Sequence, residues 1–370
     1  MRSSIAGAVL LFGVATQAGP LIDKDATPET VALYQNLRLI AREKLLFGVQ
    51  FAYTVGFHEK DSQAFANSDA KELLGDNPAV LGLDFGGMGN KWTRPTPAES
   101  VYGRVIRAVR RRGGLVTVSW HMPNPATGGN VYDRGGNAVT QVLTPGTSAR
   151  RKYFKNLDQA AAFYRDVRDD RGRPIPILFR PLHEQRGRWF WWGGENCTVE
   201  EYVELWKQTV RHLRDERDVH NLIYITSPNK PDTREKYLER FPGPEWVDVF
   251  GFDWYFPRDF ADQINASARV VVGLAREHGK LAAITENGIR GGFSAKSPTD
   301  WYARHYVDNL KSDPVANEVA WVLSWRNGGR PYHPIDRDDV RHTVPDFKAF
   351  YEDEWSVFES DLPDMYTLPR

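Results

Sequence analysis

Residues 175–184 read IPILFRPLHE, an apolar run that ends in a histidine and a glutamate. The run lacks the strict alternation of polar and apolar residues that is typical of a half-exposed strand. Continuous apolar runs of this length are typical of strands buried on both faces of a parallel sheet. The stretch therefore predicts a buried parallel strand with His183 and Glu184 at its carboxyl end.

Seven further runs along the chain have the same character. The eight runs are Leu45–Tyr53, Val80–Gly87, Leu115–His121, Ile175–Glu184, Leu222–Ser227, Val247–Tyr255, Leu281–Glu286 and Val319–Trp325. The segments between them are helical in pattern, since Ala160 to Val167 and Val199 to Leu213 carry apolar residues three and four apart. Thr198 is a suitable N-cap for the second of these helices.

Strand-like runs that alternate with helices predict a (β/α)8 TIM barrel. An open doubly wound sheet is the alternative that this periodicity allows. No low-complexity linker or short repeat divides the sequence. We therefore expect one barrel domain over residues 19–370.

Charge and tryptophan content limit the class of partner. Lys+Arg and Asp+Glu number 48 each in the 370-residue chain, so no excess charge attracts nucleic acid or an anionic membrane. We expect neither as a partner. The 12 tryptophans are more than a core usually needs, and indole faces are common stacking surfaces for sugar rings.

Residues 1–18 have the pattern of a secretory signal peptide. Arg2 supplies a positive charge, Ile5 to Val14 an apolar run, and Ala15 to Ala18 a small-residue cleavage pattern. The run is shorter than the ~20 apolar residues that span a bilayer. We expect a protein secreted to the extracellular or periplasmic space that starts near Gly19; a buried first helix is the alternative.

Polar and aromatic residues follow the predicted strands at their carboxyl ends. They are Trp120-His121, His183-Glu184, Asp253-Trp254-Tyr255, Glu286 and Trp325-Arg326. Active sites of such barrels lie at this end, and burying these groups unpaired would be costly. We therefore expect them to form one site.

Glu184 and Glu286 end the fourth and seventh runs, which face each other across the mouth of a closed barrel. Glycoside hydrolysis needs two carboxyl groups, one to protonate the leaving oxygen and one to meet the anomeric carbon. The placement favours the ~5–5.5 Å separation of retaining enzymes over the ~6.5–9.5 Å of inverting ones. The structural alternative is that one glutamate forms a salt bridge with Arg180 or Arg290.

The two glutamates have different neighbours in the sequence. Glu184 precedes the aromatic stretch Trp189–Trp192, which we expect to shield it and raise its pKa, as a general acid requires. Glu286 lies beside Asn287, and we expect it to stay ionised, as a nucleophile requires.

The segment RPLHEQRGRWFWWG at residues 180–193 resembles the acid/base signature of glycoside hydrolase family 26, the β-mannanases. Three further motifs are similar to that family: SWHMPNP around His121, ITENG around Glu286 and VLSWRN around Trp325. The resemblance extends from about Leu46 to Asn327.

This resemblance implies a (β/α)8 barrel that cleaves β-1,4-mannans (mannan, galactomannan or glucomannan) by retaining double displacement. It implies that Glu184 is the acid/base and Glu286 the nucleophile. It also implies sugar contacts at His121, His183, Trp189, Tyr255 and Trp325, with Arg326 at the next sugar outward.

Several alternatives stay open. The family also includes end-wise mannobiohydrolases, mixed-linkage β-glucanases and β-1,3-xylanases, and a sugar-binding protein without catalysis is a further reading. We expect no cofactor and no metal, since Gly187 interrupts the zinc-binding pattern that His183-Glu184 begins. We expect a monomer, and a solvated loop over Asn130–Arg150, which is rich in Gly and Thr.

Overall fold

The computed structural model describes residues 21–61, 63–86, 90–256 and 261–369. The predicted signal peptide at residues 1–18 lies outside this part of the chain, as does Gly87 of the second predicted run. Within the described residues, no helix is both long and apolar enough to cross a membrane.

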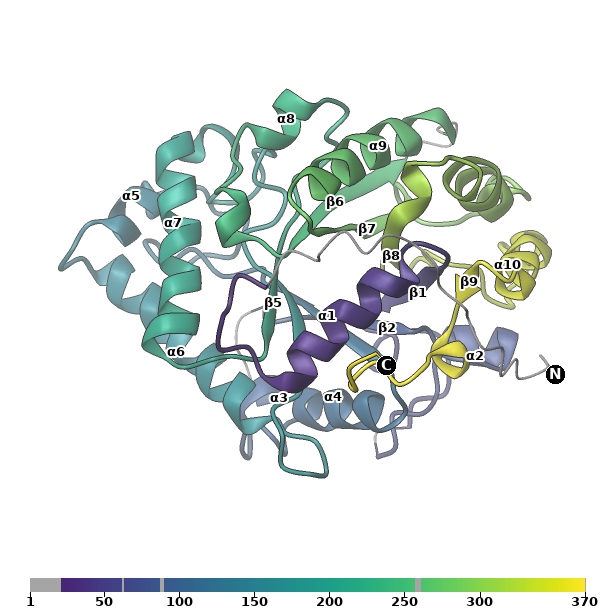
Figure 1. The fold of residues 1–370 in the computed structure, drawn as a ribbon, viewed down its shortest axis with the longest axis horizontal. Coiled ribbons are helices and arrows are strands. Elements are labelled where there is room, and N and C mark those ends of the chain that lie inside the picture. Colours follow the sequence, from purple (N-terminus) through teal and green to yellow (C-terminus); the bar gives the residue numbers. More distant parts are fainter. Residues whose placement is uncertain (1–20, 62, 87–89, 257–260, 370) are drawn as a thin grey trace.

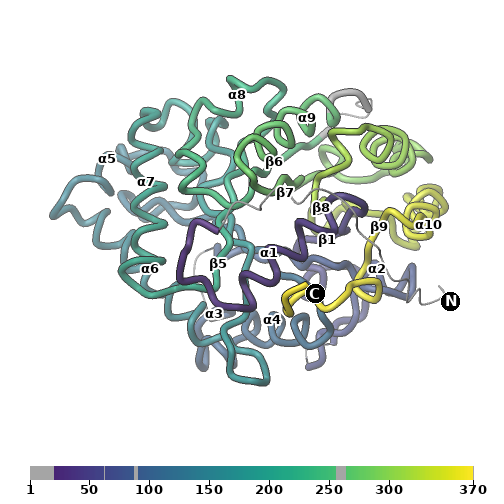
Figure 2. The backbone as a smooth tube through the Cα atoms, in the orientation of Figure 1, coloured from purple at the N-terminus to yellow at the C-terminus, as the bar shows by residue number. Residues whose placement is uncertain are grey.

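Helices surround a central ring of strands (Figures 1 and 2). The barrel strands are β1 (Leu45–Gln50), β2 (Val80–Asp84), β3 (Leu115–Ser119), β4 (Ile177–Arg180), β5 (Leu222–Thr226), β6 (Val249–Phe256), β7 (Leu281–Ile289) and β8 (Val319–Ser324), and β9 (Ser356–Val357) pairs with β1 outside this set. The helices are α1 (Pro28–Ile40), α2 (Asp69–Leu74), α3 (Asn90–Thr93), α4 (Val101–Arg111), α5 (Ala138–Leu143), α6 (Ser148–Asp166), α7 (Val199–Arg211), α8 (Arg234–Leu238), α9 (Ala261–Glu277) and α10 (Val344–Glu352), with a π-helical segment η4 (Ala303–Lys311) between β7 and β8.

The sheet is parallel and closes on itself. Gly48 of β1 pairs with Val80 of β2 on one side and with Leu323 of β8 on the other. The predicted (β/α)8 TIM barrel is therefore confirmed, and the open doubly wound sheet is wrong.

Strands β1 and β4 end before the apolar runs that predicted them, because the backbone leaves the extended conformation there. Phe51 adopts φ 56° directly after β1. Leu182 and Glu184 adopt φ 49° and 53° after β4, a left-handed conformation that non-glycine residues rarely take. His183 and Glu184 therefore stand in the loop above β4, outside the sheet.

One apolar cluster takes at least one buried residue from each of the eight barrel strands, Leu178 and Ile223 among them. Leu33 and Leu37 of α1 belong to the same cluster. Figure 1 shows α1 lying across the middle of the ring, with the C-terminus beside it. Burial of each such side chain stabilises the fold by about 1.5–3 kcal/mol. The end of the barrel that α1 covers is therefore closed by apolar packing.

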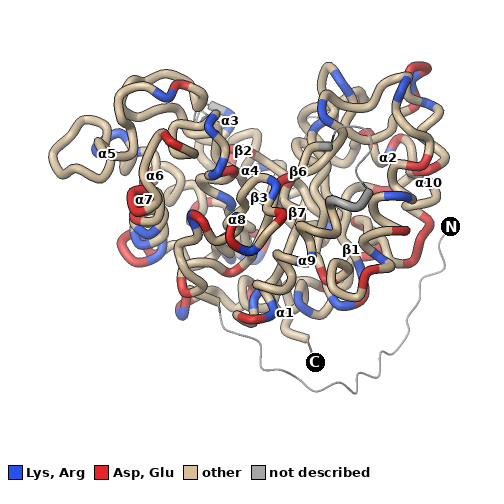
Figure 3. The backbone as a smooth tube through the Cα atoms, turned by 90° about the horizontal axis from the view of Figure 1, so that it is seen from above, with Lys and Arg blue, Asp and Glu red and all other residues tan. Residues whose placement is uncertain are grey.

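Charged residues of both signs are interspersed along the chain, as Figure 3 shows. This distribution agrees with the equal numbers of cationic and anionic residues, 48 each.

Thr198 caps α7 as predicted. The Thr198 side chain accepts a hydrogen bond from the backbone N–H of Glu201 (3.2 Å), and the Glu201 carboxylate accepts one from the N–H of Thr198 (2.9 Å). This reciprocal arrangement satisfies two N–H groups that a helix start otherwise leaves free.

We expect Thr198→Ala to lower the free energy of unfolding by about 1 kcal/mol, because the N–H of Glu201 loses its acceptor. Urea denaturation measures this change. Thr198→Ser keeps the hydroxyl and should lose much less; an equal loss in both variants would contradict the cap.

Candidate active site

The buried guanidinium of Arg180, at the end of β4, lies at the centre of the polar end of the barrel. Its Nη1 donates to Oδ2 of Asp253 (2.7 Å) and to Oγ of Ser227 (3.1 Å), and its Nη2 donates to Oε1 of Glu286. Burial acts to lower the pKa of Arg180, but the two carboxylates outweigh it and raise that pKa. Arg180 therefore stays charged while joining β4, β6 and β7.

Glu286 is 4% exposed and both of its carboxylate oxygens are occupied. Oε1 accepts from Arg180, and Oε2 accepts from the hydroxyl of Tyr255 (2.8 Å). The predicted salt bridge of a glutamate with Arg180 thus exists, and it holds Glu286 within the site instead of removing it from the site. Asn287, its sequence neighbour, instead accepts a hydrogen bond from Tyr306 (2.9 Å).

Glu184 lies in the loop after β4, partly buried. Its backbone N–H donates to the carbonyl of Ser227 (2.7 Å), and its carbonyl accepts from the N–H of Gly187 (2.8 Å). These contacts hold the residue in its left-handed conformation. Oε2 of Glu184 accepts a hydrogen bond from Nε1 of Trp189 (2.7 Å).

Burial and the negative charge of Glu286 together raise the pKa of Glu184 to about 7. The hydrogen bond from Trp189 and the charge of Arg180 oppose this shift but do not cancel it. The raised pKa of Glu184 is what a general acid needs near neutral pH.

The aromatic stretch after Glu184 does not act as one shield. Trp189 contacts the glutamate and is 39% exposed. Trp191 and Trp192 are buried and donate instead to backbone carbonyls, of Met122 (2.9 Å) and His183 (2.9 Å) respectively. The prediction that the whole stretch covers Glu184 is wrong for these two residues, because their rings belong to the core beneath the loop.

His121 and His183 lie together, with ring centroids 4.6 Å apart. Nδ1 of His121 is 2.7 Å from Oδ2 of Asp84, at the end of β2. Burial acts to lower the pKa of His121, but the charge of Asp84 outweighs it and the pKa is raised. His183 has no such partner, and burial together with the charge of Arg180 lowers its pKa well below the ordinary value.

Tyr255 and Trp325 form the facing wall, with ring centroids 6.5 Å apart. The Trp325 ring lies 6.5 Å from that of His121. Arg326 is exposed and lies near Tyr102, where its charge partly offsets the raising effect of burial on the pKa of that phenol. Hydrogen bonds and ring contacts thus link five of the predicted residues: Glu286, Tyr255, Trp325, His121 and His183. Trp189, to which Glu184 is bound, reaches this group through the ring of Phe190.

Two residues of this region, Asp84 and Tyr132, were not predicted as part of the site. Asp84, the last residue of β2, orients His121, and nothing in the sequence beyond its place in an apolar run marks it. Asp253, which was expected at the site with Trp254 and Tyr255, orients Arg180. Tyr132 is 60% exposed and its ring lies 5.6 Å from that of Phe190. The ring of Phe190 in turn lies 5.1 Å from that of His121, so Tyr132 borders the site. Burial and the charges of Glu184 and Glu286 raise the pKa of Tyr132.

Tyr132 belongs to the segment Asn130–Arg150, for which the expected solvated loop is wrong in part, since only some of its residues form an exposed loop. Its first part borders the site, and the rest forms α5 and the start of α6. The N–H of Trp191 donates to the carbonyl of Val131 (3.3 Å). That bond attaches the segment to the loop that carries Glu184.

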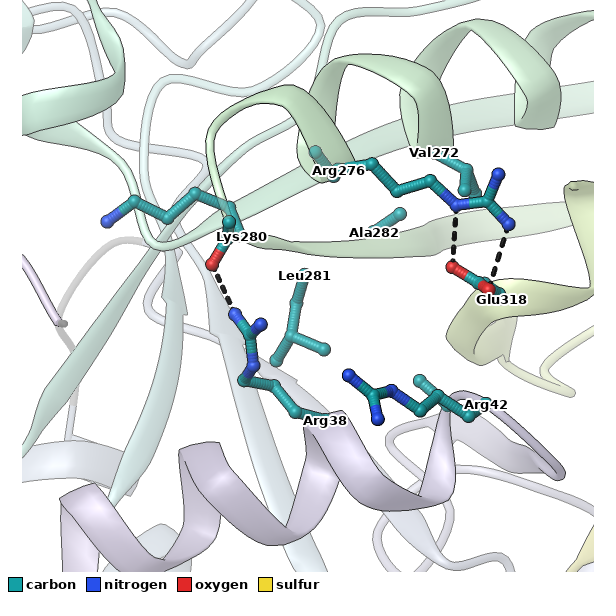
Figure 4. Close-up of a pocket in the computed structure, with 11 residues that line it drawn as sticks. Arg38, Arg42, Val272, Arg276, Lys280, Leu281, Ala282 and Glu318 are labelled. Carbon is teal, nitrogen blue, oxygen red and sulfur yellow. Dashed lines mark hydrogen bonds and ion pairs between the residues drawn. The ribbon is translucent and has the colours of Figure 1, made fainter. Parts of the chain in front are cut away.

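A cavity of about 620 Å³ lies between α1, α9 and the start of β7, away from these residues (Figure 4). Arg38 and Arg276 line it near the carboxyl ends of α1 and α9, where cations offset the negative end of the helix dipole. Arg276 is paired with Glu318 (2.8 Å) and Arg38 donates to the carbonyl of Gly279. These two cations thus have a structural explanation, and none of the predicted site residues lines this cavity.

The model of a known family, glycosyl hydrolase family 26, matches residues 22–321. A mannan endo-1,4-beta-mannosidase of Bifidobacterium adolescentis is 32% identical in an alignment that covers 100% of this chain and 40% of that protein. Another, of Bacillus subtilis, is 29% identical over 69% of this chain and 74% of its own length. The chain thus spans about two fifths of the length of the Bifidobacterium relative.

Solved structures of mannanases are also similar to this chain. A modular endo-beta-1,4-mannanase from Cellulomonas fimi superimposes with a TM-score of 0.85 at 34% identity, covering 94% of this chain and 79% of that one. A beta-mannanase from Bacteroides ovatus gives a TM-score of 0.82 at 31% identity, covering 92% of this chain and 98% of that one.

We expect Trp189→Phe to raise the pKa of Glu184 above its value of about 7. The indole N–H stabilises the carboxylate form, so its removal favours the protonated form. Carbon-13 NMR titration of labelled glutamate measures the shift. Trp246→Phe, a substitution of a tryptophan outside this site, is the control; a pKa that falls or stays constant in the Trp189 variant would disprove the role of the hydrogen bond.

Proposed function

The chain belongs to glycosyl hydrolase family 26, and we propose that it is an endo-acting β-1,4-mannanase that retains the configuration at the anomeric carbon. The observation that carries this proposal is a pair of carboxyl groups, one of which raises the pKa of the other. Glu184 has a pKa raised to about 7 by burial and by Glu286. Glu286 accepts hydrogen bonds from Arg180 and Tyr255 at the facing strand ends.

In the first step the carboxylate of Glu286 attacks the anomeric carbon and the bond to the leaving oxygen breaks. Glu184 donates its proton to that oxygen, so the leaving sugar departs as a neutral alcohol. In the second step Glu184, now a carboxylate, takes a proton from water. The resulting hydroxide attacks the anomeric carbon, releases Glu286 and restores the starting protonation states.

The surrounding residues have distinct tasks in this scheme. Arg180 and Tyr255 orient the nucleophile and stabilise its charge when it leaves the sugar. Trp189 and Trp325 provide indole faces, and His121 and His183 polar edges, to the sugar being cleaved. We place Arg326 at the next sugar outward, as the resemblance of the VLSWRN motif to the family implies, and its exposure after β8 is consistent with that place.

Mannan is the proposed polysaccharide because relatives of this chain that cover 57% to 100% of it are named as mannan endo-1,4-beta-mannosidases. The chain is neutral overall, with 48 residues of each charge, which suits an uncharged polymer. We further propose that residues 19–370 form one catalytic domain, that the protein is secreted through the signal at residues 1–18, and that it acts as a monomer.

Azide tests the two carboxylate roles separately. We expect Glu286→Ala and Glu184→Ala each to abolish turnover of mannan, with folding intact by circular dichroism. On a dinitrophenyl mannobioside, azide should rescue Glu286→Ala to the α-glycosyl azide, because it attacks from the side that the nucleophile vacated. It should rescue Glu184→Ala to the β-glycosyl azide, because it attacks the covalent intermediate. A β-glycosyl azide from Glu286→Ala and an α-glycosyl azide from Glu184→Ala would instead make Glu184 the nucleophile and Glu286 the acid/base.

Products from mannohexaose distinguish the endo-acting enzyme from an end-wise one. We expect a mixture of oligosaccharides from the first time points, since both ends of the cleft must admit a chain. Mannobiose alone from the outset would indicate a mannobiohydrolase. Cleavage of barley glucan or β-1,3-xylan in preference to mannan would change the substrate, and binding without any product would indicate a sugar-binding protein.

A further inference from the structure

The carboxylate of Asp69 lies between two loops at the active-site end of the barrel. Asp69 is the first residue of α2 and is 5% exposed. Its Oδ1 accepts from the backbone N–H groups of Phe57 (2.8 Å) and His58 (2.6 Å), in the loop after β1, and lies 2.9 Å from Nδ1 of His58. Its Oδ2 accepts from Nδ2 of Asn327 (2.9 Å), in the loop after β8.

Asn327 organises the loop after β8. Its Oδ1 accepts from the backbone N–H groups of Tyr332 (2.6 Å) and His333 (3.2 Å). The hydroxyl of Ser324 donates to the carbonyl of Tyr332 (3.0 Å). These bonds close the segment 325–332 into a turn with fixed ends.

That turn carries the residues that we assign to sugar binding. Trp325 and Arg326 directly precede Asn327 in the sequence. The backbone N–H of Trp325 donates to the carbonyl of Asn287 (3.1 Å), so one end of the turn is attached to β7. Asp69 attaches the other end to the loop after β1, and Arg326 lies between these two attachments.

The contact between Asn327 and Asp69 requires a donor on one side and an acceptor on the other. An asparagine side chain presents two N–H donors and one carbonyl, whereas a carboxylate presents only acceptors. Here the Asn327 carbonyl is occupied by two backbone donors, so its two amide N–H groups need acceptors. Asp69 provides the short contact, at 2.9 Å, and the carbonyl of His333 a longer one, at 3.4 Å. Asn327 and Asp69 are both buried, and water therefore does not replace a lost partner.

We infer that Asp69 is a positioning residue for the sugars on the non-reducing side of the cleaved bond. It acts through Asn327 to hold Trp325 and Arg326 where they can contact those sugars. This inference rests on the proposed function. It predicts that Asp69 affects sugars beyond the one being cleaved more than the chemical step itself. The reason is that Arg326 is assigned to the next sugar outward, whereas Glu184 and Glu286 have no contact with Asp69.

The first experiment compares two substrates with the same leaving group, dinitrophenyl β-mannoside and dinitrophenyl β-mannobioside. We expect Asp69→Asn to reduce kcat/KM for the mannobioside at least about ten-fold more than for the mannoside, mainly through KM, because a displaced binding group is costly. In that variant the new amide NH2 group faces a donor in either orientation. It faces the amide of Asn327 in one orientation and the backbone N–H groups of Phe57 and His58 in the other.

A double variant restores the polarity. In Asp69→Asn/Asn327→Asp, the amide N–H at position 69 donates to a carboxylate at position 327, which still accepts from the N–H groups of Tyr332 and His333. We expect it to recover most of the lost selectivity for the mannobioside. Asp313→Asn is the control, since Asp313 is a buried carboxylate that caps the turn before β8, at the opposite end of that strand. It should lower Tm without changing the ratio of the two substrates.

Hydrogen exchange of the segment 325–333 provides a readout that does not depend on catalysis. We expect faster amide exchange in Asp69→Asn and near wild-type exchange in the double variant. Equal losses on both substrates, unchanged exchange, or no recovery in the double variant would overturn the inference. If wild-type protein cleaves neither substrate, the proposed function fails, and the exchange data alone then decide whether Asp69 holds the turn.

Discussion

The ion pairs of one buried guanidinium determine the arrangement of the active-site end of this barrel. Arg180 joins Asp253 on β6 and Glu286 on β7 from its place at the end of β4. Stability alone does not favour such a network, because well-packed apolar residues in place of a buried ion pair are often as stable or more so. Removing one partner, by contrast, costs about 3–5 kcal/mol, since the other charge stays buried. The network is therefore best understood as holding the proposed nucleophile in place.

The same network explains the state of Glu184. One guanidinium faces two carboxylates, so a third carboxylate nearby is disfavoured in its charged form. Burial and Glu286 accordingly raise the pKa of Glu184 to about 7. Its left-handed backbone, φ 53°, is the kind of local strain that surrounding contacts must hold in place. The N–H of Glu184 donates to Ser227 in the loop after β5, and its carbonyl accepts from Gly187 in its own loop, which together provide that support.

The two ends of the barrel divide stability and function between them. At one end α1 packs on the apolar interior, and its leucines exclude water. At the other end the strands carry Arg180, Glu286 and Tyr255, whose polar groups are paired with one another instead of with solvent. The loops above these strands are joined by side-chain contacts such as that of Asp69 with Asn327. The residues that we propose for substrate binding on those loops are thus placed by contacts between segments far apart in the chain.

The amino-acid sequence by itself determined the order of strands and helices and the two glutamates at the strand ends. Apolar periodicity and the position of polar residues after each run are local properties. They predicted the fold correctly, and they marked His183, Glu184 and Glu286 as the residues that we propose for the site. Only the tertiary structure decided which neighbours these residues have. Trp189 contacts Glu184 whereas Trp191 and Trp192 enter the core, Arg180 binds Glu286, and Tyr132 reaches the site from a segment that was expected to be solvated. These contacts join residues on different loops and strands, and their geometry is set by closure of the barrel, which no local pattern encodes.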